Sequence, residues 1–192
     1  MSENICAWAL RTPLERAYHD EEWGLPLRDD QRLFELLVLE YMQAGLSWST
    51  ILQKRENMRA AFDGFDAETI AAYDEVKLQA LMAEPGIIKN RLKLKALPSN
   101  AKAFLRVQKE FGSFANYFWG FVDNTPIDGK LERLEDALSQ TPLSQAIARD
   151  MKKRGFSFMG PTVVYAYMQA AGLANDHVTS CPGYLKAREG LA

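Results

Sequence analysis

Apolar residues recur along most of this chain at the three- and four-residue spacing of helices that pack one face against a core. Leu, Ala, Glu, Lys and Met are frequent, and runs of alternating apolar and polar residues rich in β-branched side chains are missing. The pattern therefore predicts an all-α protein. The predicted helices span residues 13–20, 30–44, 47–62, 67–73, 75–84, 89–109, 113–121, 143–154 and 160–172.

The longest irregular stretch in this pattern is NTPIDGK, residues 124–130, whose Pro and Gly indicate a loop. The sequence contains no internal repeat and no low-complexity linker. With 192 residues, of which 47% are hydrophobic and 25% charged, the chain has enough apolar material for one sizeable core. We therefore expect residues 1–192 to form a single domain.

One predicted helix, within LFELLVLEYMQAGLSW at residues 33–48, carries an acid on its apolar side. Projected at 100° per residue, the polar side of this helix consists of Gln31, Arg32, Glu35 and Gln43. Glu40 instead falls among apolar residues such as Leu33 and Leu36. A buried carboxylate carries a desolvation cost unless a partner offsets it. Glu40 therefore either caps a helix or pairs with a buried Arg, or it serves in a pocket.

Charge and hydropathy narrow the function classes. The net charge is −2 and the pI about 5.8, so the chain has no global basic field of the kind that attracts nucleic acid. Basic residues gather only locally, at 89–95 and 152–154. No apolar run approaches the roughly 20 residues of a membrane span. The first residues show no basic stretch followed by an apolar run, so we expect no signal peptide. We expect a cytoplasmic protein without a membrane partner.

Cysteine and histidine are few and lie near the two ends of the chain. The sequence has two of each, and they are Cys6, His19, His177 and Cys181. His177 and Cys181 would share one face if NDHVTSC, residues 175–181, were helical. The four could form a tetrahedral Cys2His2 zinc site. Surface histidines with separate buried thiols are the alternative, as is a Cys6–Cys181 disulfide, which a reducing cytoplasm disfavours.

Aromatic residues are concentrated near the suspected acid. Trp8, Tyr18 and Trp23 lie in the N-terminal segment, and Trp48 follows Glu40 by eight residues. Each ring taken alone is most simply a core residue. Gathered around one buried acid, they would form a site for a flat ligand, including a cationic one.

MAEPGIIKNRLKLK, residues 82–95, places a Pro-Gly turn between two helical patterns. The second of these patterns opens with basic residues at positions 89, 91, 93 and 95. Backbone amides at such a helix start attract phosphate, whereas the basic residues could equally form a solvated face.

The motifs CAW, AYHDEEWG, LFELLVLE, QAGLSW, ILQKRE, PGIIKNR, KKRGFSFMGPT, YAYMQAAGL and NDHVTSC follow one another in this order. Their combination resembles the 3-methyladenine DNA glycosylase I family over about residues 4–181. The resemblance implies an all-α helix-hairpin-helix DNA glycosylase fold, with the hairpin at about 75–97. It also implies that structural zinc clasps the terminal segments 1–20 and 175–185.

The same resemblance assigns an activity, a partner and site residues. The implied reaction is hydrolysis of the N-glycosidic bond of N3-methyladenine, flipped out of double-stranded DNA that carries alkylated bases; no protein partner is implied. The implied zinc ligands are Cys6, His19, His177 and Cys181. The implied base-binding residues around the catalytic Glu40 are Trp48, Tyr18, Trp8 and Trp23. The implied DNA-binding residues are Pro85, Gly86, Ile87, Ile88, Lys89 and Arg91.

The chain departs from the family pattern at two places. Tyr41 and Met42 follow Glu40 where the family usually has small residues, and they could narrow the pocket, reshape it or pack on the other side of the helix. A glycosylase for a different alkylated base, or a non-enzymatic zinc-clasped DNA-binding module, is therefore the alternative function. Pro98 interrupts the helix after the hairpin, which predicts a kink or break near Leu97.

Many helix-hairpin-helix glycosylases use an aspartate that this family lacks at the corresponding place. Neither Asp123 nor Asp176 is therefore expected to replace it. We expect Asp123 to be solvated, and Asp176 to support a zinc ligand or a helix end.

Overall fold

A computed structural model describes residues 5–189 of the chain. The predicted domain 1–192 includes residues 1–4 and 190–192, which lie outside the described residues. The predicted zinc-clasp segment 1–20 includes residues 1–4 of these. The nine predicted helices are all present, and each begins and ends within two residues of its predicted bounds. They are α1 (Pro13–Glu21), α2 (Asp30–Gln43), α3 (Trp48–Ala61), α4 (Ala67–Ala71), α5 (Glu75–Ala83), α6 (Arg91–Phe111), α7 (Phe114–Gly120), α8 (Pro142–Lys153) and α9 (Pro161–Ala170).

The remaining elements are short and were not predicted. They are the 3-10 helices η1 (Ala7–Leu10), η2 (Asp63–Phe65) and η3 (Leu134–Asp136), the strands β1 (Ile127–Asp128) and β2 (Ala174–Asn175), and helix α10 (Pro182–Glu189). The all-α prediction is confirmed apart from the two short strands. Within residues 5–189, no helix is both long and apolar enough to cross a membrane.

Short polar side chains start most of these helices, because their oxygens accept hydrogen bonds from backbone N–H groups that the first turn leaves without partners. The carboxylate of Asp29 caps α2 by accepting from the Arg32 amide at 2.8 Å. The hydroxyl of Ser47 caps α3 in the same way. Asn90 caps α6 by accepting from two successive amides. The sequence thus marks where each of these helices begins.

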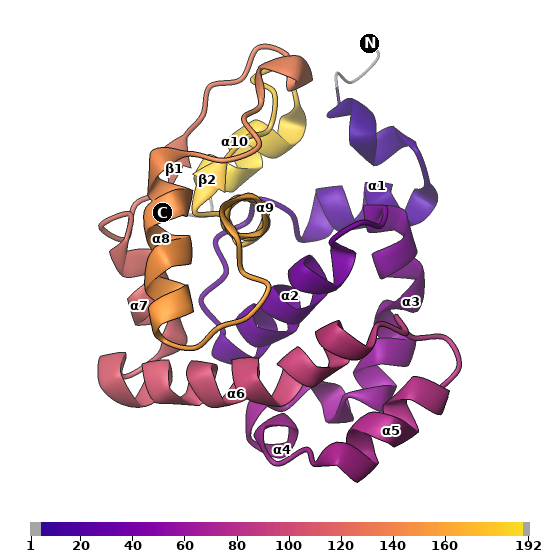
Figure 1. Cartoon of the computed structure of the whole chain (residues 1–192). Helices are drawn as coiled ribbons and strands as arrows, with labels where there is room; N and C mark the ends of the chain where they lie inside the picture. The colour runs from indigo at the N-terminus through magenta and orange to yellow at the C-terminus, as the bar shows by residue number, and fades with distance from the viewer. Residues whose placement is uncertain (1–4, 190–192) are drawn as a thin grey trace.

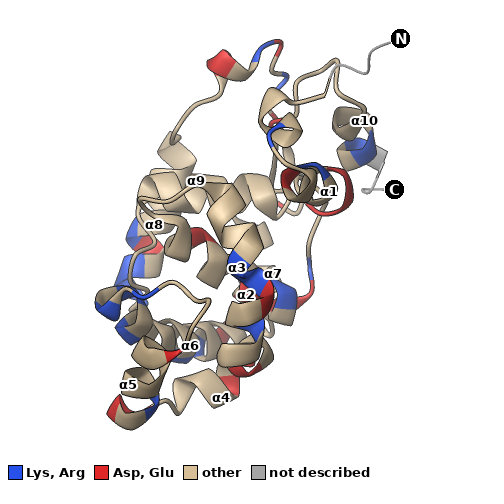
Figure 2. Ribbon diagram, turned by 90° about the vertical axis from the view of Figure 1, so that its right-hand side faces the viewer, with Lys and Arg blue, Asp and Glu red and all other residues tan. Residues whose placement is uncertain are grey.

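Helix α2 is the centre of the core. Every residue from Leu33 to Met42 is buried, and the helix packs against α3, α6, α7 and α9. Figure 1 shows α2 near the middle of the molecule, with α6 running beneath it and α9 seen end-on. Helix α9 contains no charged residue and is uncoloured in Figure 2, as expected for a second central helix. Glu40, near the C-terminal end of α2, therefore lies deep in the fold.

The break predicted at Pro98 does not occur, because α6 continues through it from Arg91 to Phe111. A proline inside a helix costs about 3 kcal/mol through its missing N–H and its clash with the preceding turn. Helix α6 buries a long apolar face that includes Leu94, Leu97 and Phe104. Burial of these side chains, at roughly 1.5–3 kcal/mol each, outweighs the cost of one proline.

The described segments nearest the two ends of the chain lie together. Strand β1 pairs in parallel with β2, so the predicted loop 124–130 contains a short strand that holds the C-terminal segment. One bridge further along, Leu131 pairs with Val178. Val178 then packs with the buried Cys6 and Cys181 in a small apolar cluster apart from the main core. This arrangement brings the N-terminal cysteine beside the C-terminal one.

Candidate active site and metal centre

The four cysteine and histidine side chains meet in one buried cluster. Their four ligand atoms all lie within 4.8 Å of one another. The Sγ atom of Cys181 lies 3.4 Å from His19 Nε2 and 3.8 Å from His177 Nδ1, and Cys6 Sγ lies 3.7 Å from His177 Nδ1. Zinc bonds of about 2.3 Å to sulfur and 2.0–2.1 Å to nitrogen would put such atoms about 3.6 Å apart in a tetrahedron. The donor set and its spacing fit a metal ion.

The local structure that presents His177 and Cys181 differs from the helix considered from the sequence. His177 follows β2, and the chain then turns, with the Cys181 amide donating to the Val178 carbonyl at 2.8 Å. The two ligands therefore share a site because of a turn. Cys6 and Cys181 are both free thiols and are not joined by a disulfide.

Each imidazole is oriented by a second contact on its other nitrogen, as ligating histidines usually are. His19 Nδ1 lies 2.8 Å from a carboxylate oxygen of Asp20, and His177 Nε2 lies 3.2 Å from the Trp23 carbonyl. Asp176, which we expected to support a ligand or a helix end, instead accepts hydrogen bonds from Tyr165 and Gln169 of α9. The supporting carboxylate is Asp20.

The two thiols differ in acidity. The hydrogen bond to Cys181, followed by burial, raises the pKa of the Cys6 thiol. The hydrogen bond from Cys6 lowers the pKa of Cys181, and contacts with His177 and His19 lower it further. Burial by itself would lower the pKa of His19, but hydrogen bonds to Cys181 and Asp20 raise it. The more acidic thiol, that of Cys181, therefore lies in contact with both imidazoles.

A cavity of about 200 Å³ lies next to this cluster. Its walls are formed by Trp8, Arg11, Glu15, Tyr18, Trp23, Glu40, Gln43, Trp48, Ala166 and Gln169. All five residues that the sequence placed around a base are in this lining. Helix α1 supplies Tyr18, α2 supplies Glu40, and α3 begins with Trp48. The ring centroids of Tyr18 and Trp48 are 5.1 Å apart.

The sequence interpretation missed the polar members of the lining, among them Arg11, Glu15 and Gln169. Gln43 lies three residues after Glu40, so helical spacing from the acid could have identified it. Gln169 carried no such signal, because it reaches the cavity only through the packing of α9 against α2.

Glu40 is 5% exposed, and burial raises the pKa of its carboxyl to about 8. The expectation that this acid lies on an apolar side is therefore confirmed. Two neighbouring donors, the Tyr18 hydroxyl and Trp48 Nε1, are buried without a hydrogen-bond partner among residues 5–189. Buried polar atoms usually have partners, so these two donors of cavity-lining residues are free to bond a further polar group.

The cavity and the cluster share a wall. Trp8 packs edge-on against His19, with ring centroids 5.4 Å apart. Trp23 packs in the same manner against His177 at 4.6 Å. Trp8 and Trp23 contact each other at 5.1 Å. The imidazoles therefore support the two tryptophans that line one side of the cavity.

Tyr41 and Met42 are absent from the cavity lining, within the described part of the chain. Both side chains are fully buried in the main core, and the Tyr41 ring stacks near Phe158 at 6.1 Å. Of the three arrangements considered from the sequence, they adopt the one on the other side of the helix. The two side chains therefore do not line or close this cavity.

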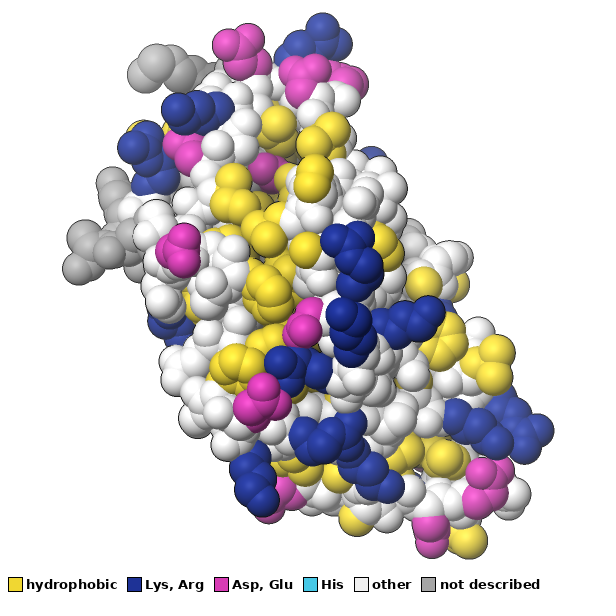
Figure 3. All heavy atoms as spheres, turned by 60° about the vertical axis from the view of Figure 1, so that its left-hand side comes forward, with side chains coloured by type: hydrophobic (Ala, Val, Ile, Leu, Met, Phe, Trp, Pro, Cys, Tyr) yellow, Lys and Arg dark blue, Asp and Glu magenta, His cyan; other side chains and the backbone are white. Residues whose placement is uncertain are grey.

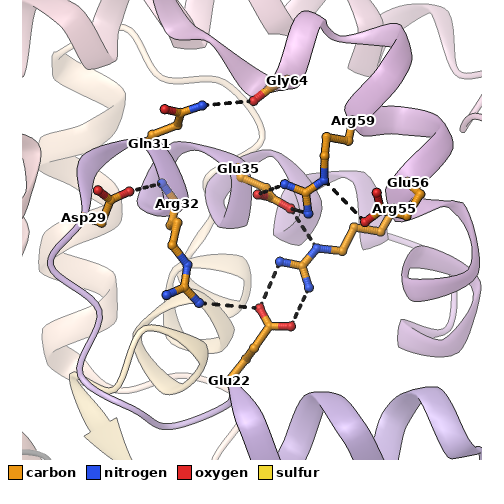
Figure 4. A network of polar contacts seen from close by, with 9 residues as sticks. All are labelled: Glu22, Asp29, Gln31, Arg32, Glu35, Arg55, Glu56, Arg59 and Gly64. Atoms are coloured by element: carbon orange, nitrogen blue, oxygen red, sulfur yellow. Dashed lines mark hydrogen bonds and ion pairs between the residues drawn. The ribbon is translucent and has the colours of Figure 1, made fainter.

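An ion network joins Glu22, the residue that caps the end of α1, to α2 and α3 (Figure 4). Glu35, which helical projection placed on the polar side of α2, is buried and accepts hydrogen bonds from Arg55 at 2.7 Å and Arg59 at 2.8 Å. The two terminal nitrogens of Arg55 also donate hydrogen bonds to the carboxylate of Glu22, at 2.7 and 2.9 Å. The network ties together the three helices that carry Tyr18, Glu40 and Trp48.

The turn between α5 and α6 has the tight geometry that its Pro-Gly sequence predicts. Gly86 has φ +84°, and an added Cβ would lie 2.4 Å from the Asn57 side chain, so this position requires glycine. Ile87 and Ile88 are buried and anchor the turn in the core. Of the six residues expected to bind DNA, Pro85, Lys89 and Arg91 are exposed and Gly86 is half-buried.

Solved structures with this fold identify the class. A crystal structure of 3-methyladenine DNA glycosylase I matches with a TM-score of 0.90 and 47% identity, covering 93% of this chain and 98% of that one. The enzyme from Staphylococcus aureus, solved to explain 3-methyladenine recognition, matches with a TM-score of 0.92 and 36% identity, covering 96% and 98%. The fold is that of a helical DNA glycosylase.

Sequence comparison makes the assignment specific. DNA-3-methyladenine glycosylase 1 of Escherichia coli (strain K12) is 44% identical over 179 residues, which cover 93% of this chain and 96% of the relative. The family model for methyladenine glycosylase matches residues 8–184. The chain belongs to the methyladenine glycosylase family, and it is a glycosylase.

Proposed function

We propose that this glycosylase hydrolyses the N-glycosidic bond of 3-methyladenine in double-stranded DNA, with the base extruded into the aromatic cavity. The observation that carries the proposal is the lining of that cavity. Tyr18 and Trp48 offer ring faces and two unpartnered donors, and Glu40 offers a carboxyl group that burial keeps protonated near neutral pH. The relative from Staphylococcus aureus, which has this fold, is described as recognising 3-methyladenine.

Cleavage of the bond between 3-methyladenine and its sugar needs little acid catalysis from the protein. A 3-methylated adenine is cationic in DNA, so the bond to the sugar breaks with its electron pair moving to the base, which leaves as a neutral molecule. Water then adds to the sugar carbon and loses a proton. The residues must hold the extruded base and exclude ordinary purines, which is the task we assign to Glu40, Tyr18 and Trp48.

The hairpin turn is our proposed grip on the DNA backbone. The backbone amides of residues 86–88 would donate to phosphate, whereas Pro85 has no N–H, and Lys89 and Arg91 extend into solvent beside them. Helix α8 exposes Arg149, Lys152 and Lys153 on another part of the molecule. Figure 3 shows Lys and Arg side chains gathered on that side. A chain with a net charge of −2 can thus still offer basic surface to a duplex.

We assign structural zinc to the cluster, held by Cys6, His19, His177 and Cys181. Four protein ligands fill a tetrahedral zinc site, which leaves no open position for water or substrate. When bound, the ion would supply cross-linking of the two ends of the chain. Elemental analysis of protein purified without chelator should find about one zinc ion per chain; the absence of stoichiometric metal would refute the assignment.

The test of function is base release from methylated duplex DNA under single-turnover conditions, with every released base identified. We expect wild type to release 3-methyladenine and Glu40→Gln to do so about tenfold more slowly or worse. The matched control is Glu56→Gln, an exposed carboxyl on α3 that should behave like wild type.

The outcomes separate the parts of the proposal. No release by folded, metal-loaded wild type would refute it, and release of a different alkylated base alone would refute the assigned substrate. Release by Glu40→Gln at the wild-type rate would leave Glu40 with only a structural role.

A further inference from the structure

Lys93 is a buried cation that the proposed function does not use. It lies three residues beyond Asn90, at the start of α6 directly after the hairpin turn, and it is 5% exposed. Its ammonium donates to the Met42 carbonyl at 2.8 Å and to the Ala44 carbonyl at 2.6 Å. From the sequence it seemed to belong with the basic residues at 89, 91 and 95, but its side chain points into the protein.

The two carbonyls belong to the last turn of α2 and to the residue that ends it. Carbonyls at a helix C-terminus lack partners within the helix, and that end carries partial negative charge. An ammonium bonded to both satisfies them and balances the charge. Lys93 therefore caps the C-terminal end of α2.

That end of α2 lies between two cavity residues. Glu40 precedes Met42 by two residues, and the chain passes from Ala44 through Gly45, at φ +80°, to Trp48. A displacement of the Ala44 carbonyl would therefore shift the acid on one side and the indole on the other. The position of the Lys93 ammonium therefore bears on the positions of both Glu40 and Trp48.

The contact is reciprocal. The Tyr41 hydroxyl on α2 donates to the Lys93 carbonyl at 3.4 Å. The side chain of Asn90, the last residue of the turn, accepts from the Lys93 amide at 3.1 Å. Backbone and side chain of Lys93 are thus tied to the hairpin on one side and to α2 on the other.

We propose that Lys93 is a positioning residue that couples the seating of the hairpin on the DNA backbone to the geometry of the base cavity. This inference rests on the proposed function. Because its ammonium is buried against carbonyls, Lys93 contributes to the rate of base release and not to the electrostatic affinity for DNA.

The test compares Lys93→Met with Lys102→Met, which removes the same charge from an exposed position on α6. Single-turnover release of 3-methyladenine and affinity for an abasic-site duplex are measured well below the melting temperature of each variant. We expect Lys93→Met to slow release about tenfold or more, because small misplacements of site residues are costly. Its DNA affinity should stay within about twofold of that of Lys102→Met.

A double-mutant cycle separates positioning from general loss of stability. If Lys93 acts through the placement of Glu40, Lys93→Met should slow a Glu40→Gln enzyme by a smaller factor than it slows wild type. Equal factors in both backgrounds, or wild-type release by Lys93→Met, would overturn the proposal.

If Lys93→Met does not fold, Lys93→Gln provides the second variant. It keeps a neutral donor near the carbonyls, and we expect release about threefold slower than wild type, because charge-assisted bonds are roughly twice as strong as neutral ones. An unchanged rate would overturn the proposal. Failure of wild type to release any base would instead refute the proposed function, so the two failures are distinguishable.

Discussion

The burial of Glu40 should make the protein lose stability as pH rises, and Glu40→Gln should remove that loss. The pKa of this carboxyl is raised by burial from 4.5 to about 8, so the native state holds the proton more tightly than the unfolded state. The stabilising contribution of the bound proton is complete below pH 4.5. It decreases as pH rises and is lost above pH 8.

The size of the effect follows from the same two values. A difference of one pH unit corresponds to 1.36 kcal/mol, so the interval from 4.5 to about 8 corresponds to about 5 kcal/mol. At pH 7 the unfolded state has already released its proton, and keeping Glu40 buried costs about 3 kcal/mol. Glutamine is neutral at every pH and has no such cost.

The assay is urea unfolding of wild type and Glu40→Gln at pH values between 5 and 9. Titrations shared by the two proteins, including those of the Cys and His cluster, cancel in the difference between their free energies of unfolding. We expect the advantage of Glu40→Gln to grow by several kcal/mol toward high pH, with equal denaturant slopes. A difference that stays constant within about 0.5 kcal/mol over this range would refute the reasoning.

Three further predictions concern the cluster and the ion network. Removing the metal with a chelator should lower the melting temperature by about 10 °C in calorimetry, and an unchanged value would contradict the clasp. Gly183→Ala should weaken metal affinity about tenfold or more, because the added Cβ would lie 2.3 Å from the His177 ring. The control is Gly120→Ala, whose Cβ would meet no atom within 4 Å. Equal metal affinities of the two variants in a chelator competition would contradict this prediction. Arg55→Met should lower the free energy of unfolding by about 1.5–3 kcal/mol, since it removes one of the two arginines bonded to the buried Glu35. A loss below about 0.5 kcal/mol in urea unfolding would contradict this prediction.

Local chemistry explains what could be predicted from the sequence. Helix starts follow from capping residues such as Asp29 and Asn90, whose effect lies within one turn of the chain. The burial of Glu40 follows from its place in the apolar pattern of α2. A count of Cys and His identified the members of the cluster, although it could not supply the turn that assembles them.

Interactions between distant segments explain the rest. Helical projection put Glu35 on the polar side of α2, where an exposed side chain is expected. It is buried because two arginines of α3 pair with it, and no residue near Glu35 in the sequence indicates that pairing. Pro98 was expected to break α6, because the packing that outweighs its cost involves other helices. The inward direction of Lys93 was equally invisible, since its carbonyl partners lie about 50 positions earlier.

The clasp between the ends has a consequence for the synthesis of the chain. Cys6 and His177 are 171 positions apart, so at ordinary rates of translation the N-terminal ligands wait on the order of 10–30 s for their partners. During that time Trp8 and Trp23 lack the His177 ring that supports them. An unfinished chain therefore already carries Glu40 and the hairpin but has no complete cavity wall. We expect the ability to remove a base to arise only after the segment with His177 and Cys181 has left the ribosome.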